Sequence, residues 1–219
     1  MKKLLALLVV LAFGAGFAQS NNAMVRVAHL SPDAPAVDVW VNGARALQNV
    51  PFKTVSNYLS LPAGEITVWV VPAGATTPRV IDARATMVAG RMYTIAATGL
   101  LNASGNQPRL GPTIIEDMLP TLAAGQAGIR VVHTSPTAPA VDVAIRGGAV
   151  VVPNLVFPRA SGYLTVPAAT YNFDVRVAGT TTVALPLNNV VLEAGKVYTV
   201  FAVGGTTAQP LSVVVAVDR

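Results

Sequence analysis

Apolar and polar residues alternate with a period of two in short runs along the chain. Such runs occupy residues 25–29, 37–41, 66–71, 173–177 and 198–203, and they are rich in Val, Ile, Thr and aromatic residues. Pro, Gly, Asn or Ser interrupts the pattern about every 8 to 12 residues, as turns between strands do. No segment keeps a helical period. The pattern predicts an all-β fold made of many short strands.

An internal repeat divides the chain into two copies. Three phrases occur twice: VRVAHLSPDAPAVDVWVNG from Val25 and IRVVHTSPTAPAVDVAIRG from Ile129, SNYLSLPAG from Ser56 and SGYLTVPAA from Ser161, and AGRMYTIAATG from Ala89 and AGKVYTVFAVG from Ala194. We expect two tandem domains, residues 19–118 and 129–219, joined by a linker at 119–128. Each copy has room for about seven or eight strands, which predicts an immunoglobulin-like β-sandwich of the fibronectin or transthyretin type.

A tyrosine follows the repeated Ala-Gly pair in both copies, at Tyr93 and Tyr198. In immunoglobulin-like sandwiches, the hydroxyl of such a tyrosine bonds the backbone across a turn and forms a tyrosine corner. We therefore place both tyrosines at the start of the penultimate strand of their copy. The last strands are expected near residues 113–118 and 211–218.

The first 18 residues have the pattern of a signal peptide. Lys2 and Lys3 precede an apolar run, and small residues lie before an expected cleavage site at Gln19. The run is shorter than the roughly 20 residues that cross a bilayer, so we do not expect a membrane-embedded chain. The sequence predicts export to the periplasm, the cell surface or the medium.

Charge and composition narrow the expected partners. The net charge of +5 falls to +3 without Lys2 and Lys3, and the remaining basic residues are scattered. Nucleic-acid binding needs a basic cluster, so no nucleic acid is expected. The chain has no cysteine and therefore no disulfide. It contains no phosphate loop, dinucleotide fingerprint or CxxC motif, and no cofactor is predicted.

The phrases HLSPDAPAVDVWVNG and HTSPTAPAVDV, followed by YLSLPAG and AGRMYTIAATG, resemble the bacterial exported family described as domain of unknown function 4397. The resemblance covers nearly the whole chain after residue 18. It implies an immunoglobulin-like β-sandwich, often in tandem, on exported or cell-surface proteins, and it implies no activity or catalytic residue. The second copy departs from the family phrase at Thr137, where the first copy has Asp33. A role that needs this carboxylate is in doubt in the second copy.

The repeated phrase contains side chains that could carry chemistry. These are His29, Ser31 and Asp38 in the first copy and His133, Ser135 and Asp142 in the second. Strand alternation places His29 on the apolar face of its strand, at the edge of the core, and Asp38 on the outward face of the next strand. We expect a structural role for all six, in which they bond backbone groups near the two proline loops.

Two chemical roles for this phrase stay open. A Ser-His-Asp hydrolase needs the base to touch both partners and needs an oxyanion hole, whereas Ser31 precedes a proline and has no glycine elbow. A metal site could use His29 with Asp33 or Asp38. Three protein ligands are usual in such a site, and Thr137 removes one ligand from the second copy.

Two further features lie outside the phrase. Alternation directs Trp40 and Trp69 outward, while their counterparts are Ala144 and Asp174. The indoles could bind a partner or ligand, because exposed apolar patches often mark contacts. They could instead cover the junction between the copies, or be buried because both faces of their strands are covered. The adjacent pair Glu116 and Asp117 is expected to cap a strand or meet an arginine.

The sequence thus predicts a non-enzymatic, exported binding or scaffolding module of the cell envelope, with an envelope protein or a glycan as its partner. One alternative is a metal-dependent binder or hydrolase that uses the duplicated His and Asp residues. Another is a self-assembling surface-layer component joined through edge strands, which are ready templates for pairing.

Overall fold

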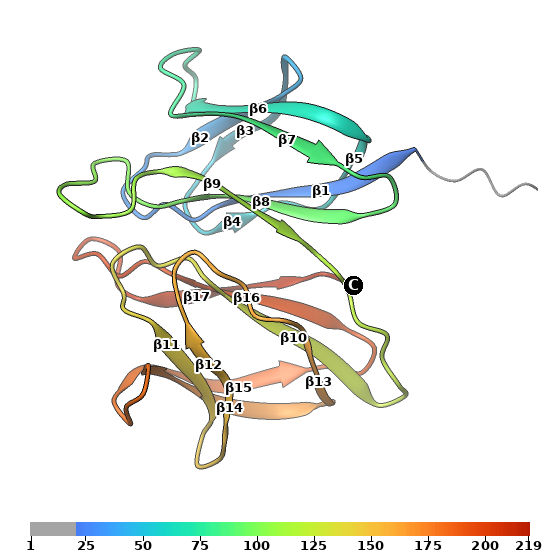
Figure 1. Cartoon of the computed structure of the whole chain (residues 1–219), viewed down its shortest axis with the longest axis vertical. Coiled ribbons are helices and arrows are strands. Elements are labelled where there is room, and N and C mark those ends of the chain that lie inside the picture. Colours follow the sequence, from blue (N-terminus) through green and yellow to red (C-terminus); the bar gives the residue numbers. More distant parts are fainter. Residues whose placement is uncertain (1–20) are drawn as a thin grey trace, which may run out of the picture.

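The computed structural model describes residues 21–219, and this part of the chain forms two β-sandwiches without any helix (Figure 1). The all-β prediction and the tandem sandwiches are therefore confirmed. The expected signal peptide at 1–18 lies outside the described residues. Among residues 21–219, no helix is present that could cross a membrane.

Seventeen strands build the two sandwiches. The first contains β1 (Asn22–His29), β2 (Val37–Val41), β3 (Ala44–Val50), β4 (Thr54–Val55), β5 (Leu59–Pro62), β6 (Gly64–Pro72), β7 (Ile81–Met87), β8 (Met92–Thr98) and β9 (Gly111–Glu116). The second contains β10 (Gln126–His133), β11 (Val141–Ile145), β12 (Val150–Leu155), β13 (Leu164–Pro167), β14 (Ala169–Val177), β15 (Val183–Leu192), β16 (Val197–Val203) and β17 (Ser212–Val217). Strand β10 thus begins inside segment 119–128.

The two copies share one topology. The first sandwich pairs the sheet β3-β2-β6-β7 with the sheet β4-β1-β8-β9, in which β5 also lies beside β1. The second pairs β12-β11-β14-β15 with β13-β10-β16-β17. Strand β1 runs parallel to β8, and β10 runs parallel to β16. The first two strands of a constant-type immunoglobulin domain share a sheet, whereas β1 and β2 lie in opposite sheets. Both copies are therefore sandwiches whose strand order differs from that of a constant-type immunoglobulin domain.

Alternation along the strands builds one apolar core inside each sandwich. In the first copy, Val25 and Val27 of β1 face Val37, Val39 and Val41 of β2 across the core. In the second copy, Ile129 and Val131 of β10 pack with the equivalent residues of β11. These side chains lie on the faces that the period of two predicts.

A third apolar cluster joins the two sandwiches. It contains Leu30 of the first copy and Val132, Phe201 and Val203 of the second, all completely buried. The sheet with β1 and β8 therefore packs face to face on the sheet with β10 and β16, and the molecule is a stack of four sheets (Figure 1). The sheet β3-β2-β6-β7 forms one outer layer of this stack.

Candidate functional site

The two histidines of the repeated phrase are buried, with 1% and 0% of His29 and His133 exposed. Nε2 of each ring lies 2.9 Å from a carbonyl oxygen, that of Pro35 for His29 and that of Pro139 for His133. Because a carbonyl oxygen only accepts, Nε2 carries the proton and donates it. Nδ1 of each ring is buried and has no hydrogen-bond partner. Burial lowers the pKa of both imidazoles and outweighs the opposite effect of the carbonyl.

Asp38 and Asp142, the equivalent aspartates of the two copies, accept hydrogen bonds from backbone amides. Each carboxylate accepts one N–H on each oxygen: Asn49 at 2.7 Å and Gly74 at 3.2 Å for Asp38, and Asn154 at 2.7 Å and Gly179 at 2.9 Å for Asp142. The asparagine N–H is the main cause that lowers the pKa of both carboxyl groups. Asn49 and Asn154 have positive φ angles of 51° and 47°, and β3 and β12 shift register near them. The carboxylates thus fix irregular turns of backbone.

The serine hydroxyl groups of the phrase, and the Asp33 carboxylate, bond the backbone of a loop that is distant in sequence. Ser31 Oγ donates to the carbonyl of Gly99 at 2.7 Å, and Asp33 accepts the N–H groups of Leu101 and Asn102, both at 2.8 Å. Ser135 Oγ repeats the first contact with Gly204 at 2.8 Å. The phrase therefore staples the loop between β1 and β2 to the loop after β8.

In the second copy, Thr137 takes over part of the role of Asp33. Its hydroxyl donates to the carbonyl of Gly205 at 2.6 Å, in the loop after β16. A carboxylate accepts two N–H groups, whereas this hydroxyl donates to one carbonyl, so the two loops have different backbone geometry. The change preserves the staple and removes the charge.

These polar groups bond mainly the backbone, and the contact that Ser31 Oγ donates to Asp33 Oδ1 at 3.3 Å joins two of them. No hydrogen bond within residues 21–219 joins a serine, a histidine and an aspartate of the phrase into a nucleophilic array. The same residues contain no group of three or more His, Cys, Asp or Glu side chains that could hold a metal ion. The arrangement stabilises loops at one end of each sandwich.

The tyrosines lie where a tyrosine corner places them. Tyr93 is in β8 and Tyr198 is in β16, the penultimate strand of each copy. The phenol oxygen of Tyr93 accepts the N–H of Val88 at 3.2 Å, and that of Tyr198 accepts the N–H of Glu193 at 3.2 Å. Both bonds cross the turn that precedes the strand.

The repeated geometry has a counterpart among known families. The sequence model of a family described as domain of unknown function (DUF4397) matches residues 23–144 and then residues 144–219. This chain belongs to the DUF4397 family. Comparison with curated proteins finds no match. The family assignment confirms the resemblance in the repeated phrases and the tandem arrangement of two DUF4397 copies.

Only the first DUF4397 copy carries outward indoles. Trp40 of β2 pairs with Trp69 of β6, and their rings stack with centroids 6.0 Å apart and planes inclined by 18°. The guanidinium of Arg79 lies 4.1 Å from the Trp69 ring centroid, and that of Arg45 lies 6.0 Å from the Trp40 ring centroid. These four side chains form a row across the outer sheet, which we call the tryptophan surface.

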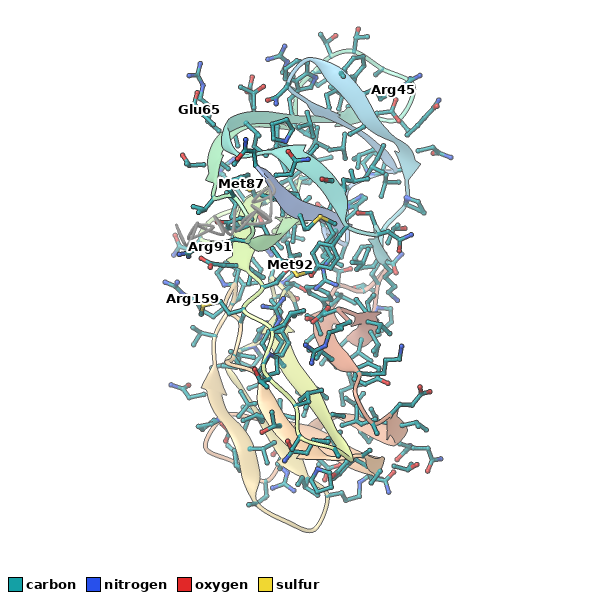
Figure 2. All side chains as sticks on the ribbon, turned by 90° about the vertical axis from the view of Figure 1, so that its right-hand side faces the viewer. Arg45, Glu65, Met87, Arg91, Met92 and Arg159 are labelled. Atoms are coloured by element: carbon teal, nitrogen blue, oxygen red, sulfur yellow. The ribbon has the colours of Figure 1, made fainter. Side chains whose placement is uncertain are left out.

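The tryptophan surface does not cover the junction between the DUF4397 copies. Its sheet, β3-β2-β6-β7, is an outer layer of the stack, whereas the junction is made by the sheets with β1 and β10. Arg45 lies at the end of the molecule away from the second copy (Figure 2). Both indoles are half-buried, and the Nε1 of Trp40 has no hydrogen-bond partner. Of the alternatives left open for the indoles, covering the junction is therefore contradicted by the structure.

The residues that join the two DUF4397 copies were not identified from the sequence. Arg26 of β1 reaches across the junction to Asp218 with Nη1 and Oδ1 2.6 Å apart, and Arg130 of β10 reaches back to Asp117. The Nε of Arg26 donates to Thr94 at 2.8 Å within its own copy, as Nε of Arg130 does to Thr199. The two copies thus exchange equivalent ion pairs across the junction.

Two tyrosines complete this interdomain cluster. Tyr58 donates to Asp117 at 2.7 Å and its ring lies 4.9 Å from the Arg26 guanidinium. Tyr163 repeats both contacts, donating to Asp218 at 2.6 Å under Arg130. Burial, and next the adjacent carboxylate, raise the pKa of Tyr58. The sequence signal was present, because a charged residue recurs at the same place of an otherwise apolar strand, and a buried charge needs a partner.

The acidic pair at the end of β9 meets arginines, as one of its two expected roles required. Glu116 pairs with Arg91 at 2.7 Å on the surface, while Asp117 is buried and pairs with Arg130. The two adjacent carboxylates therefore point to different environments. Of the two side chains, only that of Asp117 belongs to the junction between the copies.

Proposed function

We propose that this chain is an exported, non-enzymatic binding module that recognises a cell-envelope glycan through its tryptophan surface. The observation that carries the proposal is the stacked pair of Trp40 and Trp69 on the outer sheet, with Arg45 and Arg79 at its two ends. The second copy has no such pair at the equivalent positions, Ala144 and Asp174. The first copy is therefore the recognition unit, and the second supports it.

The chemistry of this surface suits a sugar. Carbohydrate rings present C–H groups on a face and hydroxyl groups around the rim, so they need apolar surface beside hydrogen-bond donors. The indoles supply the apolar surface, and large aromatic residues with a polar handle are common in binding sites. Nη1 of Arg45 pairs with Asp38 at 3.5 Å, and Nη1 of Arg79 pairs with Asp82 at 2.7 Å. The two arginine side chains are 43% and 45% exposed, so their other N–H groups can reach a ligand.

The repeated phrase supports a non-enzymatic role. Its serine, histidine and aspartate side chains are occupied by backbone groups of their own sandwich. Reactive use of Ser31 would break the contact with Gly99 that closes the end of the sandwich. These groups are better explained as supports of the loops.

The composition of residues 1–18 supports export. Two lysines followed by an apolar run and small residues are the features that a secretion pathway reads. Mass spectrometry of the protein recovered from cell fractions tests this part of the proposal. We expect the first residue to be Gln19, and a cytosolic protein that retains Lys2 and Lys3 would contradict it.

Co-sedimentation with insoluble envelope polysaccharide tests the binding role. We expect the wild type to sediment with the polysaccharide and the Trp40→Ala/Trp69→Ala variant to remain in the supernatant. The matched control is Arg84→Ala/Glu65→Ala, which removes an exposed ion pair from the same first copy and leaves the indoles intact. Circular dichroism confirms that each variant is folded. Equal sedimentation of wild type and double tryptophan variant would contradict the proposal.

A further inference from the structure

The border strands of the sheets carry features that hinder pairing with another chain, with one exception among residues 21–219. Strands β4, β5 and β13 have only two to four residues. Strand β7 carries Asp82 and Arg84, and β9 carries Pro112 and Glu116. Strands β3, β12 and β15 shift register, and the last two also contain a proline. Short strands, charges, prolines and bulges are the usual protection of sheet edges.

Strand β17 has none of these features. Its sequence SVVVAV contains no charge, proline or glycine, and its pairing with β16 is regular from Ser212 to Val217. Its equivalent in the first copy, β9, is protected, so the difference is not dictated by the fold. An edge of this kind is a template for another strand.

The hydrogen-bonding pattern defines which groups of β17 are available. Asp218 donates its N–H to the carbonyl of Val197 on β16. Because bonding directions alternate along an antiparallel strand, the N–H and C=O groups of Val213, Val215 and Val217 point to the open edge. Val215 and Val217 are also 52% and 56% exposed. Both the backbone and the side chains of β17 therefore leave contacts unmade.

Space lies beside this edge. A cleft of about 460 Å³ runs along Val214–Val217 and is bounded on its other side by segment 53–58 of the first copy. On the opposite face of the strand, Val215 lines an apolar cavity of about 60 Å³ inside the second sandwich. The side chains of β17 thus border open space on one face and an apolar cavity on the other.

We propose that β17 pairs with β17 of another molecule of this protein. The two strands run antiparallel about a twofold axis at Val215. In this register Val213 lies opposite Val217 of the other molecule, and Val215 lies opposite Val215 of the other molecule. All edge-facing backbone groups of the two strands then meet one another. Val214 lies opposite Ala216 on the other face. Every cross-strand pair between these residues is apolar and none is charged, which makes β17 complementary to itself. The result is one continuous sheet that runs through the C-terminal sandwiches of both molecules.

The solution mass of the protein tests this pairing. For the chain that begins at Gln19, light scattering coupled to size exclusion should give the mass of two chains. Val215→Lys places a charge opposite the same charge and should give the mass of one chain, while the far-ultraviolet circular dichroism spectrum stays that of the folded wild type. Ile114→Lys is the matched control, because Ile114 occupies the equivalent position of β9 and is 45% exposed; it should keep the mass of two chains.

A cysteine scan tests the register. The chain contains no cysteine, so the cysteine of Val215→Cys can form a disulfide only with the same cysteine of another molecule. Residues opposite each other in a hydrogen-bonded antiparallel pair have Cα atoms about 5.5 Å apart, within the range of a disulfide. We expect a covalent dimer from Val215→Cys under mild oxidation and none from Val191→Cys, which is 57% exposed on β15. A single-chain mass for the wild type, a two-chain mass for Val215→Lys, or equal cross-linking of both cysteine variants would overturn the proposal.

Discussion

The buried imidazoles of His29 and His133 are each suited to the neutral form. A second proton, on Nδ1, would find no hydrogen-bond acceptor. Nε2 donates to a carbonyl, and Nδ1 faces no hydrogen-bond partner. Phe52 and Phe157 lie edge-on at centroid distances of 6.3 and 6.4 Å. At the scale of single residues, the doubled phrase is therefore a set of neutral donors and charged acceptors matched to backbone groups.

This matching predicts how stability depends on pH. The pKa of both histidines is lowered in the folded state, while histidine in the unfolded chain has a pKa of about 6.5. Below that pH the unfolded state binds more protons than the folded state. The contribution of the two neutral histidines to the free energy of unfolding is therefore complete above about pH 6.5 and is lost as the pH decreases towards the folded pKa. Urea unfolding at pH 7, 6 and 5 measures the loss.

The His29→Gln/His133→Gln variant is the control for this dependence. A glutamine side chain can donate to the same carbonyl without titrating, so the free energy of unfolding should change little between pH 7 and 5. The lowered pKa of Asp38 and Asp142 acts in another window, because their contribution disappears as the pH falls below the ordinary value of 3.8. An equally steep decline in the variant between pH 7 and 5 would assign the effect to other groups.

Each sandwich is closed at the scale of its elements by bonds between side chains and turns. The tyrosine corners tie β8 and β16 to the turns before them, and the serines of the phrase tie the first loop to the loop after the penultimate strand. These bonds join segments that the sheet ladders do not connect. Their loss should weaken a sandwich without changing its topology.

Tyr93→Phe and Tyr198→Phe test this contribution separately in the two copies. Each removes one hydrogen bond to a backbone N–H and keeps the ring in its core, so each should lower the free energy of unfolding by about 0.5–1.5 kcal/mol. Urea unfolding followed by far-ultraviolet circular dichroism measures it. Tyr171→Phe, which loses a bond on the exposed side of the second copy, is the control and should cost less.

The alternation of residues was enough to predict which faces form the cores, because an inward valine every second residue is a local property of a strand. It also placed Trp40 and Trp69 outward on neighbouring strands. The partners of Ser31 and Asp33 could not be predicted, since they lie in the loop after β8 and depend on how the sandwich closes. Arg26 was visible as a recurring charge, but no local pattern indicates that its partner is in the other copy.

At the scale of the whole molecule, the reciprocal pairs of Arg26 with Asp218 and Arg130 with Asp117 make the two copies one unit. The pairs lie beside the apolar cluster of Leu30, and less than a tenth of any of the four charged residues is exposed. A buried charge left without its partner is strongly destabilising. The four-layer stack should therefore unfold cooperatively, unlike two domains on a loose linker.

Arg130→Met tests this cooperativity. It leaves Asp117 buried without its cross-junction partner and should lower the free energy of unfolding by about 3–5 kcal/mol. Adding Asp117→Leu should recover part of the loss, because the unpaired charge is removed as well. Calorimetry of the three proteins measures both effects. A change below about 1 kcal/mol, the size usual for a surface pair, would show that the junction opens in solution.

The proposal that the first copy binds a glycan predicts that the ligand contacts the two indoles directly. Trp40 and Trp69 are the two tryptophans of the chain, so its intrinsic indole fluorescence reports on the tryptophan surface alone. Titration of the wild type with soluble fragments of the envelope polysaccharide that retains it should change this fluorescence in a saturable way. Binding of those fragments without any change in indole fluorescence would contradict the account, because the ligand would then lie elsewhere on the protein.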